Sequence, residues 1–384
     1  MISTSQRNAQ LQTAVQEPST PLFNPRLLRF KHVVIALLLS VVFFLLFCFI
    51  ALHAYIAWVL TNPTVAPLYS NPMQAKSMPY EEVSFPAKDG SRMVQGWYIP
   101  ADQSRKTIIF SHGYGANREE SWIPMYDLAH YAHSLNFNVV MFDYGFASQN
   151  SKAVATGGKA ESQQLLGAIQ LAKQRGSSEI IVWGFSMGAG TALQAGLQTK
   201  DVDAMILDST FLLEPDTLYH NIHNQINLPR HPSLEILELL FPVLNGTSLH
   251  QIPYQEVKKE NYPFPIMFVH GTQDEKAPYP IAEKLAANQT NPLSSVWIVK
   301  NGIHELIFRE HPREYLRRVS TFLSSVQELE DKKTIADATN KRLRSKFFEE
   351  LYSILRLEEA CLWTLNPCRS WASFSFSMGI HCFT

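Results

Sequence analysis

The segment from residue 33 to residue 60 carries no charged side chain over 28 consecutive positions, and Ser40 and His53 are its only clear polar interruptions. As an α-helix it would be about 42 Å long at 1.5 Å per residue, whereas a bilayer core needs only about 20 residues. A buried core helix rarely continues so long without a polar face. The apolar part of a cleavable signal peptide is shorter, about 7–15 residues. The segment therefore predicts one transmembrane helix over residues 33–60.

The charges on either side of this segment predict its orientation. Arg26, Arg29 and Lys31 precede it, whereas residues 61–75 contain no charged side chain. Basic residues that flank a transmembrane helix are enriched on its cytoplasmic side. We therefore expect residues 1–32 to be a cytoplasmic N-terminal segment. The catalytic domain would then lie on the far side, which is the periplasm in a bacterium and the lumen or exterior in a eukaryote. Four prolines within residues 61–79 predict an extended tether rather than a helix.

Short apolar runs alternate with helical patterns from residue 80 onwards. The runs that predict strands are 83–86, 93–99, 107–110, 138–142, 179–183, 204–207, 265–269 and 296–299, and helical patterns occur at 161–173 and 189–199. Runs without strict polar alternation indicate strands that are buried on both faces. Strands that alternate with helices predict a mostly parallel sheet with helices on both faces. We expect one α/β domain over residues 80–328.

Two regions depart from this alternation. Residues 211–262 are long for a connection between strands and contain a helix-like stretch at 233–240, which is typical of a lid over a site. Its apolar side chains either line an acyl site or pack on the sheet; they are Phe211, Leu212, Leu213, Leu237, Leu239, Leu240 and Phe241. Residues 329–384 predict a charged amphipathic helix over 330–359, followed by a tail of unknown role. The cysteines of this region are Cys361, Cys368 and Cys382.

The sequence Gly184-Phe185-Ser186-Met187-Gly188 matches the G-x-S-x-G motif, between the predicted strand 179–183 and a helical pattern. This strand–turn–helix context is the one that the motif requires. A serine presented on such a sharp turn needs glycine two positions before and after it, because a side chain there would clash. The following helix N-terminus offers free N–H groups to an oxyanion. Ser186 is the candidate nucleophile.

A serine hydroxyl needs a base to remove its proton, and in this motif the chain order is serine, acid, histidine. Asp274 follows the predicted strand 265–269, and His304 follows the strand 296–299. Of the 13 histidines, only His304 follows a terminal strand after a loop that contains an acid. Asp208, at the end of the strand 204–207, competes with Asp274 for the role of the acid.

An oxyanion hole needs two backbone donors. The N–H group of Met187 follows the nucleophile directly. The second donor is expected from Ser111-His112-Gly113-Tyr114-Gly115, which ends the strand 107–110. We expect the N–H group of Tyr114 to point at the substrate oxygen.

These motifs together resemble the α/β-hydrolase superfamily over about residues 80–325. The motifs are His112-Gly113-Tyr114-Gly115, Asp143-Tyr144, Gly184-Phe185-Ser186-Met187-Gly188, His270-Gly271-x-x-Asp274 and Gly302-Ile303-His304. The sequence is most similar to single-span, membrane-anchored α/β-hydrolase domain proteins and to serine aminopeptidase-like and prolyl-oligopeptidase-like hydrolases. The resemblance implies an eight-stranded, mostly parallel sheet, with Ser186 as nucleophile, His304 as base and Asp274 as its orienter. It also implies no cofactor.

One motif departs from the family pattern. Members usually have Asp-x-Arg-Gly-x-Gly-x-Ser after the fourth core strand, but residues 143–148 read Asp-Tyr-Gly-Phe-Ala-Ser. The arginine and one glycine are therefore missing from a loop that borders the expected site.

The predicted function is that of a membrane-anchored serine hydrolase that cleaves an ester, thioester or amide. Its substrate would be an ester, a lipid, an acylated protein or a peptide. One alternative is an aminopeptidase-like enzyme, which needs an acid near the site to bind a free amine. Candidate acids in the insertion are Glu214, Asp216, Glu235 and Glu238. Another alternative is a non-catalytic binding protein on the same fold. A formal net charge of -1 gives no electrostatic reason to expect nucleic acid as a partner, and no Cys/His spacing suggests a metal site.

Overall fold

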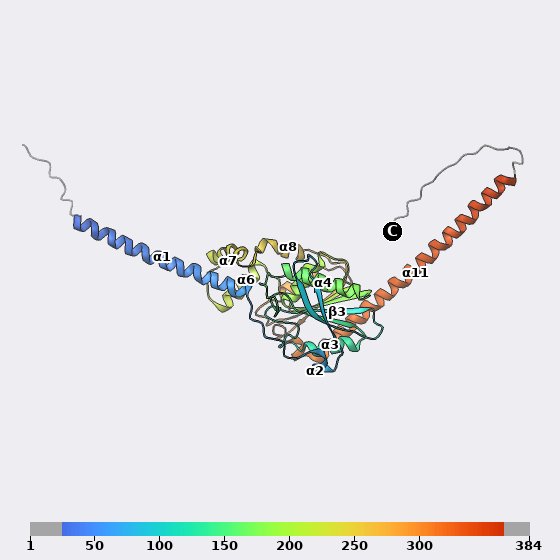
Figure 1. Cartoon of the computed structure of the whole chain (residues 1–384), viewed down its shortest axis with the longest axis horizontal. Coiled ribbons are helices and arrows are strands. Elements are labelled where there is room, and N and C mark those ends of the chain that lie inside the picture. The colour runs from blue at the N-terminus through green and yellow to red at the C-terminus, as the bar shows by residue number, and fades with distance from the viewer. Residues whose placement is uncertain (1–24, 365–384) are drawn as a thin grey trace, which may run out of the picture.

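The structure is a computed structural model that describes residues 25–364 of the chain. It has three parts: an N-terminal helix α1 (Pro25–Thr61), a central α/β body, and a C-terminal helix α11 (Pro312–Thr364). Figure 1 shows that the two long helices project from opposite sides of the body.

The body is built around a single eight-stranded sheet. Its strands are β1 (Glu81–Pro86), β2 (Met93–Ile99), β3 (Lys106–Ser111), β4 (Asn138–Phe142), β5 (Glu179–Phe185), β6 (Ala204–Asp208), β7 (Ile266–Gly271) and β8 (Ser295–Val299). The order in space is β1-β2-β4-β3-β5-β6-β7-β8. Strand β2 runs antiparallel to both its neighbours, and all the other pairs are parallel. The predicted mostly parallel, eight-stranded α/β-hydrolase sheet is confirmed.

Helices cover both faces of this sheet. Side chains of α4 (Lys159–Gln174), α5 (Met187–Gly196) and α9 (Pro280–Ala287) pack on one face. Side chains of α3 (Met125–Ser134), α10 (Ile307–Glu310) and the inner part of α11 pack on the other.

Strand β3 shows why the strand sequences are apolar throughout. Ile108 and Phe110 belong to one core, and Ile109 between them belongs to the other. A polar residue at any of these positions would be buried without water, so alternation is absent.

Helix α1 consists of an exposed apolar part and a buried end. Its most apolar window has a mean hydropathy of 3.3 and is 0% buried, which makes it a candidate transmembrane span. Residues 33–52 point almost entirely outwards and extend about 30 Å, the thickness of a bilayer core. From His53 onwards the helix contacts the body, where Ile56 and Ala57 are buried.

The insertion between β6 and β7 forms a small helical subdomain, to which we refer as the lid (residues 211–262). It contains α6 (Pro215–Gln225), α7 (Arg230–Asn245), a 3-10 turn (Leu249–Gln251) and α8 (Tyr254–Val257). Its apolar core includes Leu218, Leu237 and Phe241, together with Ile56 and Ala57 of α1.

The apolar side chains of the lid considered from the sequence take three roles: lining a cavity, packing on the sheet, and forming the core or surface of the lid itself. Phe211, Leu213 and Phe241 line a cavity that is described below. Leu212 packs into the core of the body. The other three belong to the lid core or its surface: Leu237 is buried, Leu240 packs against it and Leu239 is 74% exposed.

The segment 62–79 differs from the extended tether that its prolines predict, because it is bound to the body and contains a helix. Helix α2 (Pro72–Lys76) begins where the side chain of Asn71 accepts a hydrogen bond from the N–H group of Gln74. Asparagine is a favoured N-cap, and proline is favoured at the first helical position. The proline density therefore did not exclude a helix here.

Glu119 holds this segment against the body. The N–H groups of Tyr69 and Ser70 each donate to its carboxylate at 2.8 Å. The hydroxyl of Tyr126, on α3, donates to the same carboxylate at 2.6 Å. Glu119 is buried, so these bonds fix the segment between α1 and β1.

Helix α11 is continuous across the predicted domain boundary after residue 328. Tyr315, Val319 and Val326 on its inner part are buried against the sheet, whereas Ile335 and Leu343 farther out are exposed. The predicted helix over 330–359 is the outer part of α11. Cys361 lies near its end, and Cys368 and Cys382 lie outside the described residues.

We expect Glu119→Ala to lower the free energy of unfolding by at least about 2 kcal/mol, because it leaves two backbone N–H groups and a buried tyrosine hydroxyl without their charged acceptor. Limited proteolysis within residues 62–79 should also become faster. Glu256→Ala, at an exposed glutamate of α8, is the control. Equal stability and equal proteolysis in the two variants would contradict this account of the segment.

Candidate active site

Ser186 sits at a sharp turn between β5 and α5, with φ of 47° and ψ of -119°. The turn is fixed by backbone hydrogen bonds, because the N–H group of Ser186 donates to the carbonyl of Asp208 at 2.9 Å. A Cβ atom at Gly188 would lie 2.1 Å from the carbonyl oxygen of Ser111, and one at Gly184 would lie 2.7 Å from the Cα atom of Ala189. The steric reason for glycine on both sides of the serine is therefore confirmed.

The structure brings Ser186, His304 and Asp274 together at the carboxyl edge of the sheet. The Oγ atom of Ser186 lies 2.8 Å from Nε2 of His304. Nδ1 of His304 lies 2.7 Å from Oδ2 of Asp274. All three residues are buried, and they follow β5, β8 and β7, respectively.

Asp274 is held in its charged form by three hydrogen-bond donors and by the nearby imidazole of His270. Its Oδ1 accepts from the N–H groups of Lys276 and Ala277 at 2.9 and 2.7 Å. Its Oδ2 is bonded by His304 and lies 3.1 Å from Nε2 of His270. Burial alone would raise the pKa of Asp274, but the hydrogen bonds from His270 and His304 outweigh it and hold the pKa well below its usual range. A carboxylate here fixes the proton of His304 on Nδ1, so Nε2 is free to accept the proton of Ser186.

Asp208, the competing acid, has a different partner. Its Oδ1 accepts from the hydroxyl of Ser209 at 2.9 Å, and that hydroxyl accepts in turn from the N–H group of Glu305 at 2.9 Å. Burial raises the pKa of Asp208 to about 6. Asp208 therefore supports the loop that carries His304 through Ser209, whereas Asp274 contacts the imidazole itself.

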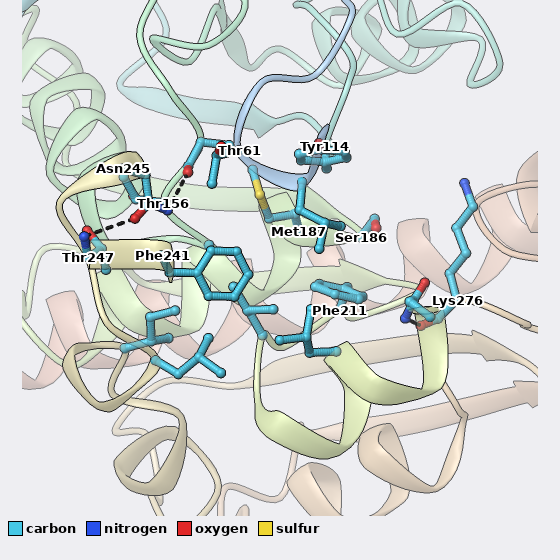
Figure 2. Close-up of a pocket in the computed structure, with 18 of the residues that line it drawn as sticks. Thr61, Tyr114, Thr156, Ser186, Met187, Phe211, Phe241, Asn245, Thr247 and Lys276 are labelled. Carbon is cyan, nitrogen blue, oxygen red and sulfur yellow. Dashed lines mark hydrogen bonds between the residues drawn. The ribbon is translucent and has the colours of Figure 1, made fainter. Parts of the chain in front are cut away.

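The loop after β3 is fixed by a neutral histidine. The N–H group of Tyr144 donates to Nε2 of His112 at 3.0 Å, so the proton of His112 is on Nδ1, which donates to the carbonyl of Gly113 at 2.9 Å. Burial lowers the pKa of His112 to about 4, consistent with this neutral tautomer. Tyr114 in this loop and Met187 line the same cavity as Ser186 (Figure 2).

A pair of buried glutamates next to the site was not found from the sequence. Oε1 of Glu120 accepts from the N–H group of Gly113 at 2.8 Å, and Oε2 of Glu305 accepts from the indole of Trp122 at 2.7 Å. A Cβ atom at Gly113 would lie 2.7 and 2.6 Å from Oε1 of Glu120 and of Glu305, so both carboxyl groups converge on this glycine. Oε2 of Glu305 is also 3.8 Å from Nε2 of His304.

Burial raises the pKa of both glutamates, and the charge of Glu305 raises the pKa of Glu120 further. Two like charges this close disfavour simultaneous ionisation. The neutral form is therefore favoured for at least one member of the pair. Its one signal in the sequence is that Glu305 directly follows His304; the approach of Glu120 depends on the fold.

The arginine missing from the loop after β4 is replaced by one from another loop. Asp143 accepts from the N–H group of Arg118 at 2.8 Å and from its guanidinium at 2.9 Å. The guanidinium also lies over the ring of Trp97, 4.7 Å from its centroid. The loop after β4 is therefore charge-compensated although its own arginine is absent.

The candidate site opens into a cavity of about 280 Å³ between the body, the lid and the end of α1 (Figure 2). Its apolar lining includes Leu60, Phe211, Leu213, Phe241, Leu249 and Ile252. The four lid acids considered as amine ligands are not among its lining residues, and Glu305 is the acid that reaches it. Within the described residues, no three His, Cys, Asp or Glu side chains are grouped to hold a metal ion.

We expect Glu120→Gln to raise the Tm at neutral pH, because the amide oxygen keeps the hydrogen bond from the N–H group of Gly113 and the substitution removes a buried carboxyl group whose pKa is raised. A carboxyl group whose pKa is raised on folding destabilises the fold as the pH rises above its ordinary value of 4.5. The gain should therefore grow from pH 4.5 upwards and vanish below it, with roughly 2–4 °C for each kcal/mol. Thermal unfolding across this pH range is the measurement. Glu256→Gln is the control, and a pH-independent difference in Tm would contradict the raised pKa of Glu120.

Comparison with known proteins agrees with the fold described above. Residues 106–230 match the sequence model of the α/β hydrolase fold. The chain is 29% identical over 259 residues to the uncharacterized protein YfhR of Escherichia coli K12, covering 64% of this chain and 81% of YfhR. Crystal structures of the Pyrococcus furiosus esterase Pf2001 align with TM-scores of 0.57 and 0.55 at 22% identity, covering 69% of this chain and 99% and 98% of theirs. The chain therefore has the α/β-hydrolase fold, and residues 106–230 match the sequence model of that fold.

Proposed function

We propose that this protein is a membrane-anchored serine hydrolase that cleaves carboxylic esters through an acyl-enzyme at Ser186. The observation that carries the proposal is the continuous chain of hydrogen bonds from Ser186 through His304 to Asp274, with distances of 2.8 and 2.7 Å, at the end of a cavity. A nucleophile, its base and the orienter of that base within hydrogen-bond reach are the signature of acyl transfer.

The reaction would proceed in two steps. In the first, Nε2 of His304 takes the proton of Ser186 while Oγ attacks the carbonyl carbon, and the imidazolium returns that proton to the departing alcohol. Asp274 stabilises the imidazolium. In the second step His304 activates a water molecule, which releases the acid from Ser186.

The backbone N–H groups of Met187 and Tyr114 would stabilise the negative charge on the substrate oxygen in both steps. Met187 begins α5, so its N–H group has no acceptor within the helix. Each such donor is worth about 10²–10³ in rate.

Several features favour an ester over a peptide with a free amine as the substrate. The cavity has a mainly apolar lining, and the lid acids lie outside it. Glu305 is the acid that lines the cavity, and its Oε2 already accepts a hydrogen bond from the indole of Trp122. An esterase, Pf2001, has the same fold.

We further propose that α1 spans a membrane, with residues 1–32 in the cytoplasm and the body on the other side. The exposed apolar residues 33–52 fit a bilayer core, and Arg26, Arg29 and Lys31 stand on the expected cytoplasmic side. Because residues 62–79 are bound to the body, the site would lie at the membrane surface.

We expect Ser186→Ala to lower kcat for p-nitrophenyl butyrate by on the order of 10⁶, and to abolish labelling by a fluorophosphonate probe. Ser324→Ala, at an exposed serine of α11, should behave as the wild type in both assays. Full hydrolysis and labelling of Ser186→Ala would place the nucleophile elsewhere.

The identity of the acid can be tested separately. We expect Asp274→Asn to lower kcat about 10⁴-fold, because the amide favours the wrong tautomer of His304. Asp208→Asn should change kcat far less, since Asp208 acts on the loop through Ser209. Steady-state kinetics of both variants measure these changes in kcat. A larger loss of kcat in Asp208→Asn than in Asp274→Asn would identify Asp208 as the acid that orients His304.

A further inference from the structure

The last two turns of α1 are part of the hydrolase body. Ile56 and Ala57 are buried in the lid core beside α7, and Thr61 is also buried. Figure 1 shows α6 and α7 at the end of α1 where it meets the body. Removal of α1, as with a cleaved leader, would uncover the lid core. The helix is therefore built into the fold, beyond any role as an anchor.

Hydrogen bonds connect the end of α1 to both sides of the candidate site. The hydroxyl of Tyr114 donates to the carbonyl of Val59 at 2.8 Å. The N–H group of Ala155 donates to the carbonyl of Thr61 at 2.7 Å, and the side-chain amide of Asn245, on the lid, donates to the carbonyl of Ala155 at 3.0 Å. The end of α1 thus positions the loop of Tyr114 on one side and the lid on the other.

The same end of α1 is one wall of the cavity. Leu60 and Thr61 line it together with Leu213 and Phe241 of the lid. Figure 2 shows Thr61, Phe241 and Ser186 around this cavity. An apolar cavity of about 150 Å³ holds one benzene ring. By simple proportion, six carbons in about 150 Å³ correspond to roughly 11 carbons in about 280 Å³, so we expect an acyl chain of roughly 8–12 carbons.

We propose that this cavity binds the acyl chain of a lipid ester, with the end of α1 as one wall of the acyl site. The apolar lining favours an acyl chain as the group that is bound. A membrane lipid is favoured as the donor of this chain because the exposed apolar surface of α1 continues from the cavity wall at Leu60 into residues 33–52. The inference rests on the proposed function, because an acyl chain held here is cleaved only if Ser186 is the nucleophile.

The test compares acyl-chain preference in the full-length protein in detergent. The kcat/KM for p-nitrophenyl esters from acetate to palmitate should be highest at about 8–12 carbons. Leu60→Trp fills the cavity and should lower the ratio of kcat/KM for decanoate to that for acetate by at least tenfold. Leu46→Trp, on the exposed part of α1, should leave this ratio unchanged.

A second variant keeps the proposal testable if Leu60→Trp fails to fold. Leu60→Ala enlarges the cavity and should shift the preferred chain towards longer esters. If neither substitution changes the chain-length profile while Ser186→Ala abolishes hydrolysis, the acyl site is wrong and the proposed function stands. If Ser186→Ala hydrolyses every ester as the wild type does, the proposed function fails first.

A comparison of two substrates tests whether the acyl chain comes from a lipid or from an acylated protein. Vesicles of didecanoyl phosphatidylcholine should be hydrolysed with a higher kcat/KM than a soluble peptide that carries an S-decanoyl cysteine. Preference for the peptide would overturn the assignment to a lipid ester and favour an acylated protein.

Discussion

The close packing of backbone against backbone at the carboxyl edge of the sheet is the constraint on which the candidate site depends. Ser186 adopts its φ of 47° because its N–H group is bonded to the end of β6 and because Gly188 lies against the end of β3. Three adjacent strands therefore determine where one hydroxyl points. The loops after β7 and β8 meet this hydroxyl because parallel strands all end at the same edge.

Around His304, the surroundings of each carboxyl group determine its charge. Hydrogen bonds lower the pKa of Asp274, whereas burial raises the pKa of Asp208, Glu120 and Glu305. The charged form is thereby favoured most at the one carboxylate that contacts Nδ1 of the imidazole. The neighbouring acids, for which burial favours the neutral form, hold the surrounding loops in place through their hydrogen bonds.

The strands and the order of Ser186, Asp274 and His304 could be predicted from the sequence because each leaves a local pattern: a short apolar run, or a motif at the end of one. Other features depend on distant residues. Glu120 approaches Glu305 only after folding, and the prolines of 62–79 do not indicate that Glu119 binds their neighbours. Hydropathy also could not separate Ile56 and Ala57, which face the lid, from the residues of α1 that face outwards, because both surroundings are apolar.

The shared core of α1 and the lid has a consequence for how the protein is made. Ile56 and Ala57 are synthesised long before Leu218, Leu237 and Phe241, with the strands β1 to β6 between them. The lid core therefore closes late, through contacts of high sequence separation, which form slowly. Where α1 enters a membrane during synthesis, its end is already held at the surface when the lid emerges. Membrane insertion would then act as the first folding step of a domain that lies outside the bilayer.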